Sequence, residues 1–372
     1  MVDSRKKPRI LYLATFDPTV SATGTSTRGK LFLKFFCANY DTHLVHMREK
    51  DADGKDDSLI SLTSIIPVDY SNISYFLFSP KLYQAATEIL QCKPFDLIFA
   101  DFEKSGWYAY LLSRKFRVPY IYNSHNVEFR RYKDFARRNA LRYPLVPYMH
   151  FVEKTACKNA LFTVAISEED AKIFKRWVPE EKVLAMPCAF DESIVNPFYK
   201  EVRTRYPIIL IVGNYRNPGN REGAYLMYKK VLPDVLRKYP ETIFRFIGKN
   251  FPGDIQHRNI ESPGFVNDLM SEYKKATAVV VPIAMGGGIK IKTIEGLACG
   301  KFVISTQKGI EGIDISSLVN LKVLAIEQFA DCIINVISKP IEKTTRNWNK
   351  IEKAYGIKHQ LSEIKERITL YV

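Results

Sequence analysis

Along the first half of the chain, apolar and polar positions follow two patterns, one typical of strands and one typical of helices. Short runs rich in branched and aromatic residues are typical of buried strands, and the longer stretches between them repeat apolar residues at helical spacing. The predicted strands are Arg9–Phe16, Thr42–Met47, Leu62–Val68, Asp96–Ala100, Pro119–Tyr122, Leu161–Ile166 and Lys182–Met186, and the predicted helices are Lys30–Asn39, Tyr75–Gln91, Gly106–Phe116 and Glu168–Trp177. Strands that alternate with helices in this way predict right-handed βαβ units and a mostly parallel, doubly wound α/β sheet.

A second series of the same kind follows the irregular, proline-containing segment 187–205. Its predicted strands are Pro207–Val212, Thr242–Ile247, Ala278–Pro282, Phe302–Ser305 and Leu321–Ala325, and its predicted helices include Arg221–Tyr239 and Asp268–Lys275. We therefore expect two Rossmann-like domains, residues 1–190 and 191–344, followed by a helical tail, residues 345–372. Because ligands bind at the carboxyl ends of the strands in such sheets, we also expect an interdomain cleft that holds the ligand.

The stretch Met285–Thr306, MGGGIKIKTIEGLACGKFVIST, carries the clearest candidate chemistry. It follows the predicted strand Ala278–Pro282 with a glycine turn and a predicted helix, Ile289–Ala298. A helix N-terminus presents unpaired N–H groups and about half a positive charge, which suits a diphosphate. Lys290 and Lys292 would add charge, and Glu295 lies on the same face as Lys292 and can accept bonds from two ribose hydroxyls. The alternative is a glycine turn with a solvated Lys/Glu pair.

Composition places the chain among globular proteins that are neither secreted nor membrane-spanning. No run of 18 uncharged apolar residues occurs, and the N-terminus leads into a strand rather than a signal-peptide core. The six cysteines are scattered without metal-ligand spacing, as expected of reduced thiols in a cytoplasmic protein. We therefore expect a cytoplasmic location and no structural metal.

The formal net charge is +15, and much of it is concentrated between Lys104 and Lys158, a segment that contains twelve Lys/Arg residues and three acidic residues. Aromatic residues are interleaved with these basic residues, which suits an anionic membrane surface contacted through residues 114–158 and a peripheral location. The alternative is a solvated basic face packed on its own domain. A nucleic-acid-binding protein is a rival interpretation, although no recognised nucleic-acid motif is present, so no nucleic acid is expected.

Two other patterns resemble metal or nucleotide sites and are set aside. Gly24–Lys30 fits a phosphate loop, but Leu31 stands where that motif needs a hydroxyl for magnesium. Asp51 and Asp53 form a DxD motif within a run of solvated charges. The sequence therefore predicts no metal site and no cofactor.

Five segments in a fixed order carry a resemblance over nearly the whole length. They are YNSHNVEFRRY (122–132), AISEED (165–170), LIVGNYRNPGNREGAYLMYKKVLPDV (210–235), PGFVNDLMSEYKKATAVVVPI (263–283) and GGGIKIKTIEGLACGKFVIST (286–306). With them the chain resembles the retaining glycosyltransferases of family 4, which have the two-domain GT-B fold.

The resemblance implies roles for particular residues. Glu295 would hold the ribose of a nucleoside diphosphate sugar, and Lys290 and Lys292 would neutralise its diphosphate. From the first domain, Gly24 would lie against the diphosphate and His125 would reach the transferred sugar. For His125 the alternative is a buried histidine that bonds its own loop. The family's tail helix crosses back to the first domain, and the tail here is expected to do the same.

Two positions depart from the family pattern. Many relatives carry a sugar-binding glutamate where this chain has Gly287, so backbone N–H groups of Gly287 and Gly288 are expected to bind sugar hydroxyls instead. The basic pair that usually follows the first strand of the second domain is missing, and Arg216 is the remaining phosphate candidate.

The sequence therefore predicts a metal-independent, retaining hexosyl- or N-acetylhexosaminyl-transferase. Its acceptor would be a hydroxyl of a lipid-linked sugar or a surface glycan, and the leaving phosphate would take the acceptor proton on the front side, as the resemblance implies. Two further alternatives are a catalytically silent GT-B scaffold and a sugar-nucleotide epimerase, which would act without an acceptor.

Overall fold

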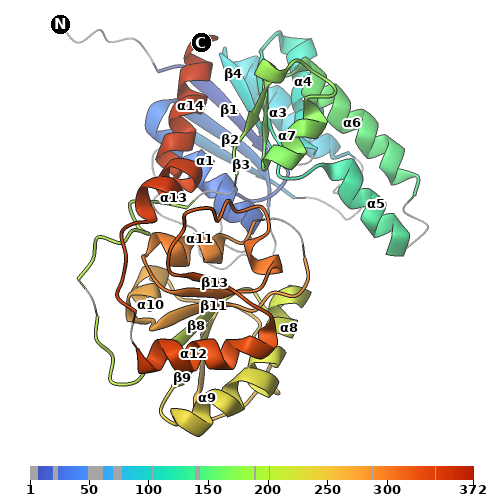
Figure 1. Cartoon of the computed structure of the whole chain (residues 1–372). Helices are drawn as coiled ribbons and strands as arrows, with labels where there is room; N and C mark the ends of the chain where they lie inside the picture. Colours follow the sequence, from blue (N-terminus) through green and yellow to red (C-terminus); the bar gives the residue numbers. More distant parts are fainter. Residues whose placement is uncertain are drawn as a thin grey trace, which may run out of the picture. The chain divides into compact units, whose positions relative to one another are not determined.

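The computed structural model describes residues 7–19, 24–48, 62–69, 78–102, 104–138, 143–187, 190–200, 202–286, 289–339 and 341–372. The chain divides into two compact units. Unit 1 comprises Met1–Pro187 and Leu361–Val372, and unit 2 comprises Cys188–Gln360. Each unit has its own parallel sheet flanked by helices (Figure 1). The predicted class of two doubly wound α/β sheets is confirmed.

Within the described part of unit 1 the sheet has seven strands in the order β3-β2-β1-β4-β5-β6-β7. Every neighbouring pair is parallel. The strands are β1 (Arg9–Ala14), β2 (Asp41–Met47), β3 (Ser64–Val68), β4 (Leu97–Asp101), β5 (Tyr120–Asn123), β6 (Thr163–Ala165) and β7 (Val183–Ala185). The order reverses between β1 and β4, so the carboxyl ends of these two strands form the switch point where ligands bind in such sheets.

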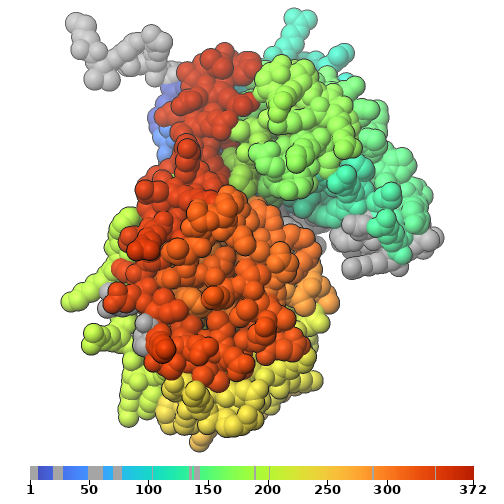
Figure 2. Space-filling model, in the orientation of Figure 1, coloured from blue at the N-terminus to red at the C-terminus, as the bar shows by residue number. Residues whose placement is uncertain are grey.

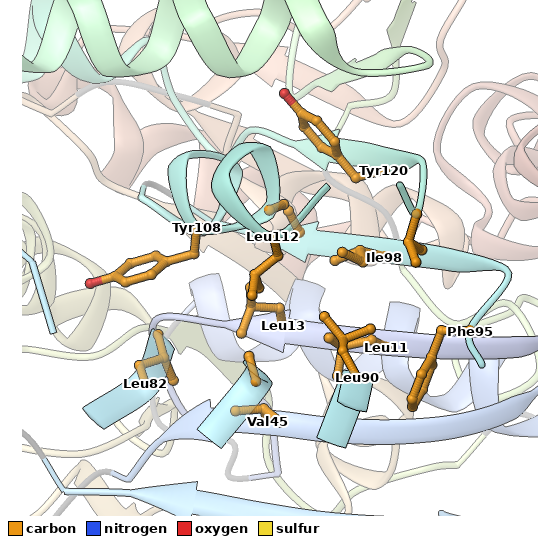
Figure 3. Close-up of a cluster of buried hydrophobic side chains, with 14 of the residues drawn as sticks. Leu11, Leu13, Val45, Leu82, Leu90, Phe95, Ile98, Tyr108, Leu112 and Tyr120 are labelled. Atoms are coloured by element: carbon orange, nitrogen blue, oxygen red, sulfur yellow. The ribbon is translucent and has the colours of Figure 1, made fainter. Parts of the chain in front are cut away.

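Alternate residues of β1 face opposite sides of this sheet and pack against different helices. Leu11 and Leu13 join a buried cluster with helices α3 (Pro80–Cys92) and α4 (Ser105–Phe116), shown in Figure 3. Tyr12 points to the other face, where its ring lies 5.7 Å from that of Phe36 on α1 (Gly24–Asn39). Both faces of the sheet are therefore covered, as the near-continuous apolar character of β1 requires.

The start of α1 differs from the sequence prediction. The predicted helix begins at Lys30, but the observed helix begins at Gly24. Gly29 is needed for close packing rather than for a turn, because a Cβ there would lie 2.4 Å from the ring of Phe16. The Tyr12 hydroxyl oxygen also lies 3.0 Å from the carbonyl oxygen of Gly29, which places this turn of the helix beside β1.

The basic segment of unit 1 contains two helices that the sequence did not predict, α5 (Glu128–Arg138) and α6 (Leu145–Asn159). The carboxylate of Glu153, on α6, accepts a bond at 3.0 Å from the backbone N–H of Glu128 and so caps the start of α5. Helix α7 (Glu168–Phe174) and the short η3 (Glu180–Lys182) complete the unit before β7. No helix among the described residues is both long and apolar enough to cross a membrane.

The described residues of unit 2 form a sheet of six parallel strands in the order β10-β9-β8-β11-β12-β13. They are β8 (Ile208–Val212), β9 (Ile243–Ile247), β10 (Ile260–Gly264), β11 (Ala278–Val281), β12 (Val303–Ser305) and β13 (Leu321–Val323). Of these, β10 was not predicted. The order reverses between β8 and β11, which places a second switch point at their carboxyl ends.

Two buried clusters cover the faces of this sheet. On one face lie α8 (Pro218–Leu226), α9 (Leu232–Lys238) and α12 (Phe329–Ser338), and on the other lie α10 (Leu269–Lys275), α11 (Ile291–Ala298) and α13 (Trp348–Tyr355). The expected single helix Arg221–Tyr239 is interrupted by a π-helical segment, η4 (Met227–Val231). Pro233 lies in the first turn of α9 and has no N–H to bond the preceding turn, which accounts for the local change of register. Short turns η5 (Lys308–Ile310) and η6 (Ile326–Gln328) precede β13 and α12.

The tail forms α13 and a second helix, α14 (Ile357–Thr369), and the division between the units falls within α14. The carboxylate of Glu192 accepts bonds from the backbone N–H groups of Ile357 at 3.0 Å and Lys358 at 2.8 Å, which caps the start of α14 within unit 2. In unit 1, Lys365 donates to the side chain of Asn39 at 2.8 Å and Arg367 donates to the carbonyl of Glu181 at 2.7 Å.

Candidate functional site

The candidate residues fall into two groups, one in each unit, and both groups lie at the carboxyl ends of strands near a switch point. In unit 2, Lys290 is the N-cap residue of α11, and Lys292 and Glu295 lie in its first turns. Gly286 takes a φ of 101°, a left-handed conformation that favours glycine, with open space around it. Gly287 and Gly288 lie outside the described residues.

The ammonium of Lys292 is held by two neutral oxygen atoms. It donates to the carbonyl of Val212, the last residue of β8, at 2.7 Å and to Oδ1 of Asn220 on α8 at 2.6 Å. The amide group of Asn220 also donates to the carbonyl of Asn214 at 2.9 Å, which orients its oxygen toward the lysine. Lys292 therefore bridges α11 to the end of β8 and to α8.

Burial, and to a smaller extent the charge of Lys290, lower the pKa of Lys292 to about 7, while Glu295 opposes this shift. Burial also lowers the pKa of Lys290. Among the described residues Lys292 makes no ion pair. Its ammonium contacts a backbone carbonyl oxygen and a side-chain amide oxygen, and both are neutral. The positive charge of this site is thus incompletely compensated, and a bound anion would stabilise the charged form.

Glu295 is oriented by a buried tyrosine. Its Oε2 accepts a hydrogen bond of 2.8 Å from the hydroxyl of Tyr273, at the end of α10. Burial raises the pKa of Glu295, while the tyrosine bond and Lys292 oppose that shift. The residue as a whole is partly exposed, and with one oxygen anchored the other oxygen can accept further bonds.

Helix α8 packs unusually close to the loop that precedes the glycine turn. A Cβ on Gly219 would lie 2.4 Å from the carbonyl oxygen of Met285, and a Cβ on Gly223 would lie 2.4 Å from that of Pro282. The side chain of Asn217 caps this helix by accepting a bond of 2.9 Å from the N–H of Gly219. The glycines of α8 therefore bring its N-terminus beside the loop after β11.

Arg216 lies exposed in the loop between β8 and α8. Its backbone N–H donates to Asn214 at 3.0 Å, but its guanidinium makes no hydrogen bond or ion pair with any other described residue. The side chain is therefore available to a ligand at this strand end.

In unit 1 the candidate His125 is buried and bonded to a carboxylate. Its Nε2 lies 2.8 Å from Oδ1 of Asp101, the last residue of β4, and the side chain of Asn123 donates to the same oxygen at 2.7 Å. The hydroxyl of Tyr12 donates to Oδ2 of Asp101. Burial and the nearby Asp101 charge raise the pKa of Tyr12, which keeps this donor protonated.

Arg28 connects the first turns of α1 to this group. It donates to Oδ1 of Asn123 at 3.3 Å and to the carbonyl of Pro187 at 3.2 Å. Gly24 is the first residue of α1, so its backbone lies at a helix N-terminus. Asp101 is the centre of this network, with His125, Asn123 and Tyr12 all bonded to it.

Three residues of these groups were missed as candidates. Asn220 and Tyr273 lie in segments that carry the resemblance, but nothing in the sequence shows which side chains reach Lys292 and Glu295. Asp101 was not named as a candidate, and its place directly after the predicted strand Asp96–Ala100 was the available signal. The rejected Asp51 and Asp53 lie outside the described residues, and no cluster of three or more potential metal ligands occurs among the residues described.

Comparisons with known proteins agree with this arrangement. The model named Glycosyltransferase Family 4 matches residues 35–193, and the model named Glycosyl transferases group 1 matches residues 206–339. No curated protein matches the sequence.

Solved structures resemble the chain over nearly its whole length. Sucrose-phosphate synthase from Thermosynechococcus elongatus is 17% identical with a TM-score of 0.72, over 99% of this chain and 100% of that one. HepE from Anabaena, in complex with UDP and glucose, is 13% identical with a TM-score of 0.67, over 98% of this chain and 99% of that one. The lipopolysaccharide outer core galactosyltransferase WaaB is 14% identical with a TM-score of 0.60, over 98% of this chain and 100% of that one.

The solved structures are similar to this chain in fold. The two family models match its sequence, the first mainly in unit 1 and the second in unit 2. Together with the paired doubly wound sheets, they show that the chain belongs to the GT-B glycosyltransferases, with a family 4 domain followed by a group 1 glycosyl transferase domain.

Proposed function

We propose that the protein transfers a sugar from a nucleoside diphosphate donor to a hydroxyl acceptor, with retention of the anomeric configuration. The observation that carries the proposal is the ammonium of Lys292 at the carboxyl ends of β8 and β11, which is bonded only to neutral oxygen atoms. A partly buried ammonium held only by neutral oxygen atoms is suited to a ligand that brings negative charge.

In this proposal Lys292, Lys290 and the N-terminus of α11 bind the diphosphate. As the bond between the sugar and the diphosphate breaks, negative charge grows on the leaving phosphate, and these preorganised groups stabilise it. Removing one such group typically costs about 3 kcal/mol of transition-state stabilisation. The cationic groups supply this charge without a metal ion, and no cofactor is needed. Arg216 is a further candidate contact for the phosphates.

Glu295 binds the ribose in this proposal. Tyr273 holds one carboxylate oxygen, which restricts the rotamer, and the other oxygen accepts bonds from ribose hydroxyls. In unit 1, His125 contacts the transferred sugar and Asp101 sets the orientation of its ring. Gly24 offers the backbone of a helix N-terminus to the diphosphate.

The donor is tested with a panel of nucleoside diphosphate sugars by thermal shift. HepE has been solved with UDP and glucose, so a uridine diphosphate hexose is the first candidate for this chain. A ligand that binds the folded state raises the melting temperature, and Lys292→Gln and Glu295→Gln should each remove the shift while the proteins stay folded. An undiminished shift in both variants would contradict the proposed site.

Retention and the need for an acceptor are tested on the product. Proton NMR of the new glycosidic bond should show the anomeric configuration of the donor, and inversion would contradict the proposal. Conversion of the sugar nucleotide without any acceptor would instead identify an epimerase.

We further propose that the acceptor lies at an anionic membrane surface. Arg130, Lys133 and Arg137 are exposed at helical spacing on α5, and on the neighbouring α6 the side chain of Phe151 is 60% exposed. Figure 2 shows α5 and α6, teal to green, at the surface. Basic heads beside an exposed aromatic ring suit lipid phosphates and the interfacial region.

A flotation assay tests this surface with vesicles of phosphatidylcholine, with and without phosphatidylglycerol. The wild type should float with the anionic vesicles, and the triple change of Arg130, Lys133 and Arg137 to Gln should abolish flotation. Equal recovery with both kinds of vesicle would refute the proposal, and transfer to a soluble acceptor should remain unchanged in the variant.

A further inference from the structure

Lys292 places a nucleophilic nitrogen atom in the first turn of α11. Its Nζ makes two hydrogen bonds, one of 2.7 Å to the carbonyl of Val212 and one of 2.6 Å to Oδ1 of Asn220, and no ion pair with a described residue. An ammonium has three N–H groups, whereas a neutral amine has two N–H groups and a lone pair. The two acceptors therefore bind every N–H group of the neutral form and leave its lone pair unbonded.

The surroundings of Nζ favour this neutral form. Burial, and to a smaller extent the charge of Lys290, lower the pKa of Lys292 to about 7. At pH 8 about nine-tenths of the molecules then carry a neutral amine here, compared with about 0.4% for an ordinary lysine, whose pKa is about 10.4. The residue is partly exposed, and the neighbouring Gly286 has open space around it, so a small electrophile can reach the nitrogen from solvent.

The electrostatics at this position favour a product with a negative charge. Two charged side chains shift the pKa of Lys292, and Lys290, which disfavours a positive charge on Nζ, has a larger effect than Glu295, which favours one. Lys292 is also in the first turn of α11, where the helix dipole places about half a positive charge. Both effects would stabilise an anion formed on Nζ.

This preference separates two classes of electrophile. An aldehyde would form an imine with the amine and release water, which leaves a nitrogen atom without an N–H group for Val212 or Asn220 and creates no negative charge. Carbon dioxide would form a carbamate, which keeps one N–H group for these acceptors and carries a carboxylate. The hydrogen bonds and the charges around Nζ therefore match carbon dioxide.

We propose that Lys292 is a carbamate site that binds carbon dioxide covalently and reversibly. The lone pair of Nζ attacks the carbon atom, one C–O π bond opens onto its oxygen atom, and Nζ releases one proton to water. The product is an N-carboxylated lysine with one negative charge. The reverse steps return the amine and carbon dioxide.

The carbamate blocks the donor site, and this part of the inference rests on the proposed function. It replaces a cation with an anion at the place proposed for the diphosphate, so the modified protein does not bind the donor. The apparent Kd rises by the reciprocal of the unmodified fraction, so that modification of nine-tenths of the protein raises it about tenfold. Transfer activity then falls as the concentration of carbon dioxide rises.

The carbamate is detected by chemical trapping at pH 8. The probe is carbon dioxide supplied as isotopically labelled bicarbonate. Triethyloxonium ions convert a carbamate into a stable ethyl ester, mass spectrometry of a digest locates the label, and glycinamide in the same sample confirms that the trapping works. Lys292→Arg keeps a positive charge and N–H donors but has no amine to modify, and Lys238→Gln is a control at the exposed end of α9.

The wild type and Lys238→Gln should carry the label at Lys292, about 200-fold above the level at an ordinary lysine. Lys292→Arg should carry no label at that position, and melting temperatures check that both variants fold. Wild-type protein in which Lys292 stays unlabelled while glycinamide is labelled would overturn the proposal.

The block of the donor site is measured by calorimetry with UDP, in bicarbonate or in chloride at constant pH and ionic strength. At nine-tenths modification the wild type should bind UDP about tenfold more weakly, and Lys292→Arg should bind it equally in both salts. Unchanged UDP binding by labelled wild-type protein would refute the block. If no form of the protein binds UDP, the label at Lys292 still decides the carbamate, so failure here is distinct from failure of the proposed transferase activity.

Discussion

The lowered pKa of Lys292 predicts that donor binding takes up a proton. In the free protein this lysine is about half protonated near pH 7, since burial lowers its pKa to about 7. A diphosphate beside the ammonium favours the charged form, so the pKa in the complex should return toward its usual value of about 10.4.

The direction of the pH dependence follows from these two values. Below pH 7 the lysine is charged in both the free protein and the complex, so its full electrostatic attraction for the diphosphate is available. Between pH 7 and the pKa of the complex, free protein must gain a proton in order to bind, so affinity falls about tenfold for each pH unit. From pH 7, where the lysine is already half neutral, to pH 9 the loss is about 50-fold, or about 2.3 kcal/mol of binding free energy.

The assay is calorimetry of a nucleoside diphosphate sugar at pH 8 in two buffers with different heats of ionisation. Wild-type protein should take up about 0.9 proton per ligand, because a lysine with a pKa of about 7 is then mostly neutral. The two phosphate groups of the donor are diesters that do not titrate in this range, so the proton belongs to the protein.

Lys292→Gln should remove the uptake and flatten the pH profile, and Lys238→Gln, at the exposed end of α9, should preserve both. Donor binding that depends on Lys292 but shows neither proton uptake nor loss of affinity between pH 7 and pH 9 would refute the reasoning.

Three further predictions address the groups that hold the site. Tyr273→Phe removes the bond to Glu295 and should weaken donor binding about tenfold while stability changes little, as titration calorimetry and melting would show; unchanged affinity would dismiss the orienting role. Asp101→Asn removes the charged partner of His125, so kcat should fall by a larger factor than KM changes and the pH profile of kcat should shift. An unaltered profile would contradict the role of Asp101 in positioning the His125 ring. Gly223→Ala places a methyl group 2.4 Å from the carbonyl of Pro282 and should cost about 1–3 kcal/mol of unfolding free energy, whereas equal denaturant midpoints would show that α8 can move away.

The fold could be predicted from the sequence because strands of parallel sheets are apolar throughout and the helices between them are amphipathic. β1 and β8 were located within two residues for this reason. β10, with the sequence IESPG, was missed because it is a partly exposed edge strand with no apolar run. The start of α1 was misplaced because a glycine needed for packing against Phe16 looks like a turn glycine in the sequence.

The candidate site could be predicted from the sequence only where its residues are close together in the chain. Lys292 and Glu295 lie on one turn of α11, so their spacing revealed them. Asn220 and Tyr273 reach the same site from other elements, 72 and 22 residues away from their partners, and no local pattern reports such a contact. The hydrogen bonds that lead from Asp101 to His125 also depend on two strands being adjacent in the sheet.

The neutral partners of Lys292 have a consequence for the life of the protein in a cell. A site that holds an under-neutralised ammonium is least favourable when it is empty, and a bound donor relieves that cost. At a donor concentration 100 times the dissociation constant, the folded state gains about 2.7 kcal/mol. If the proposed donor is a sugar nucleotide, its depletion should therefore shorten the lifetime of this protein, because proteases act on opened molecules.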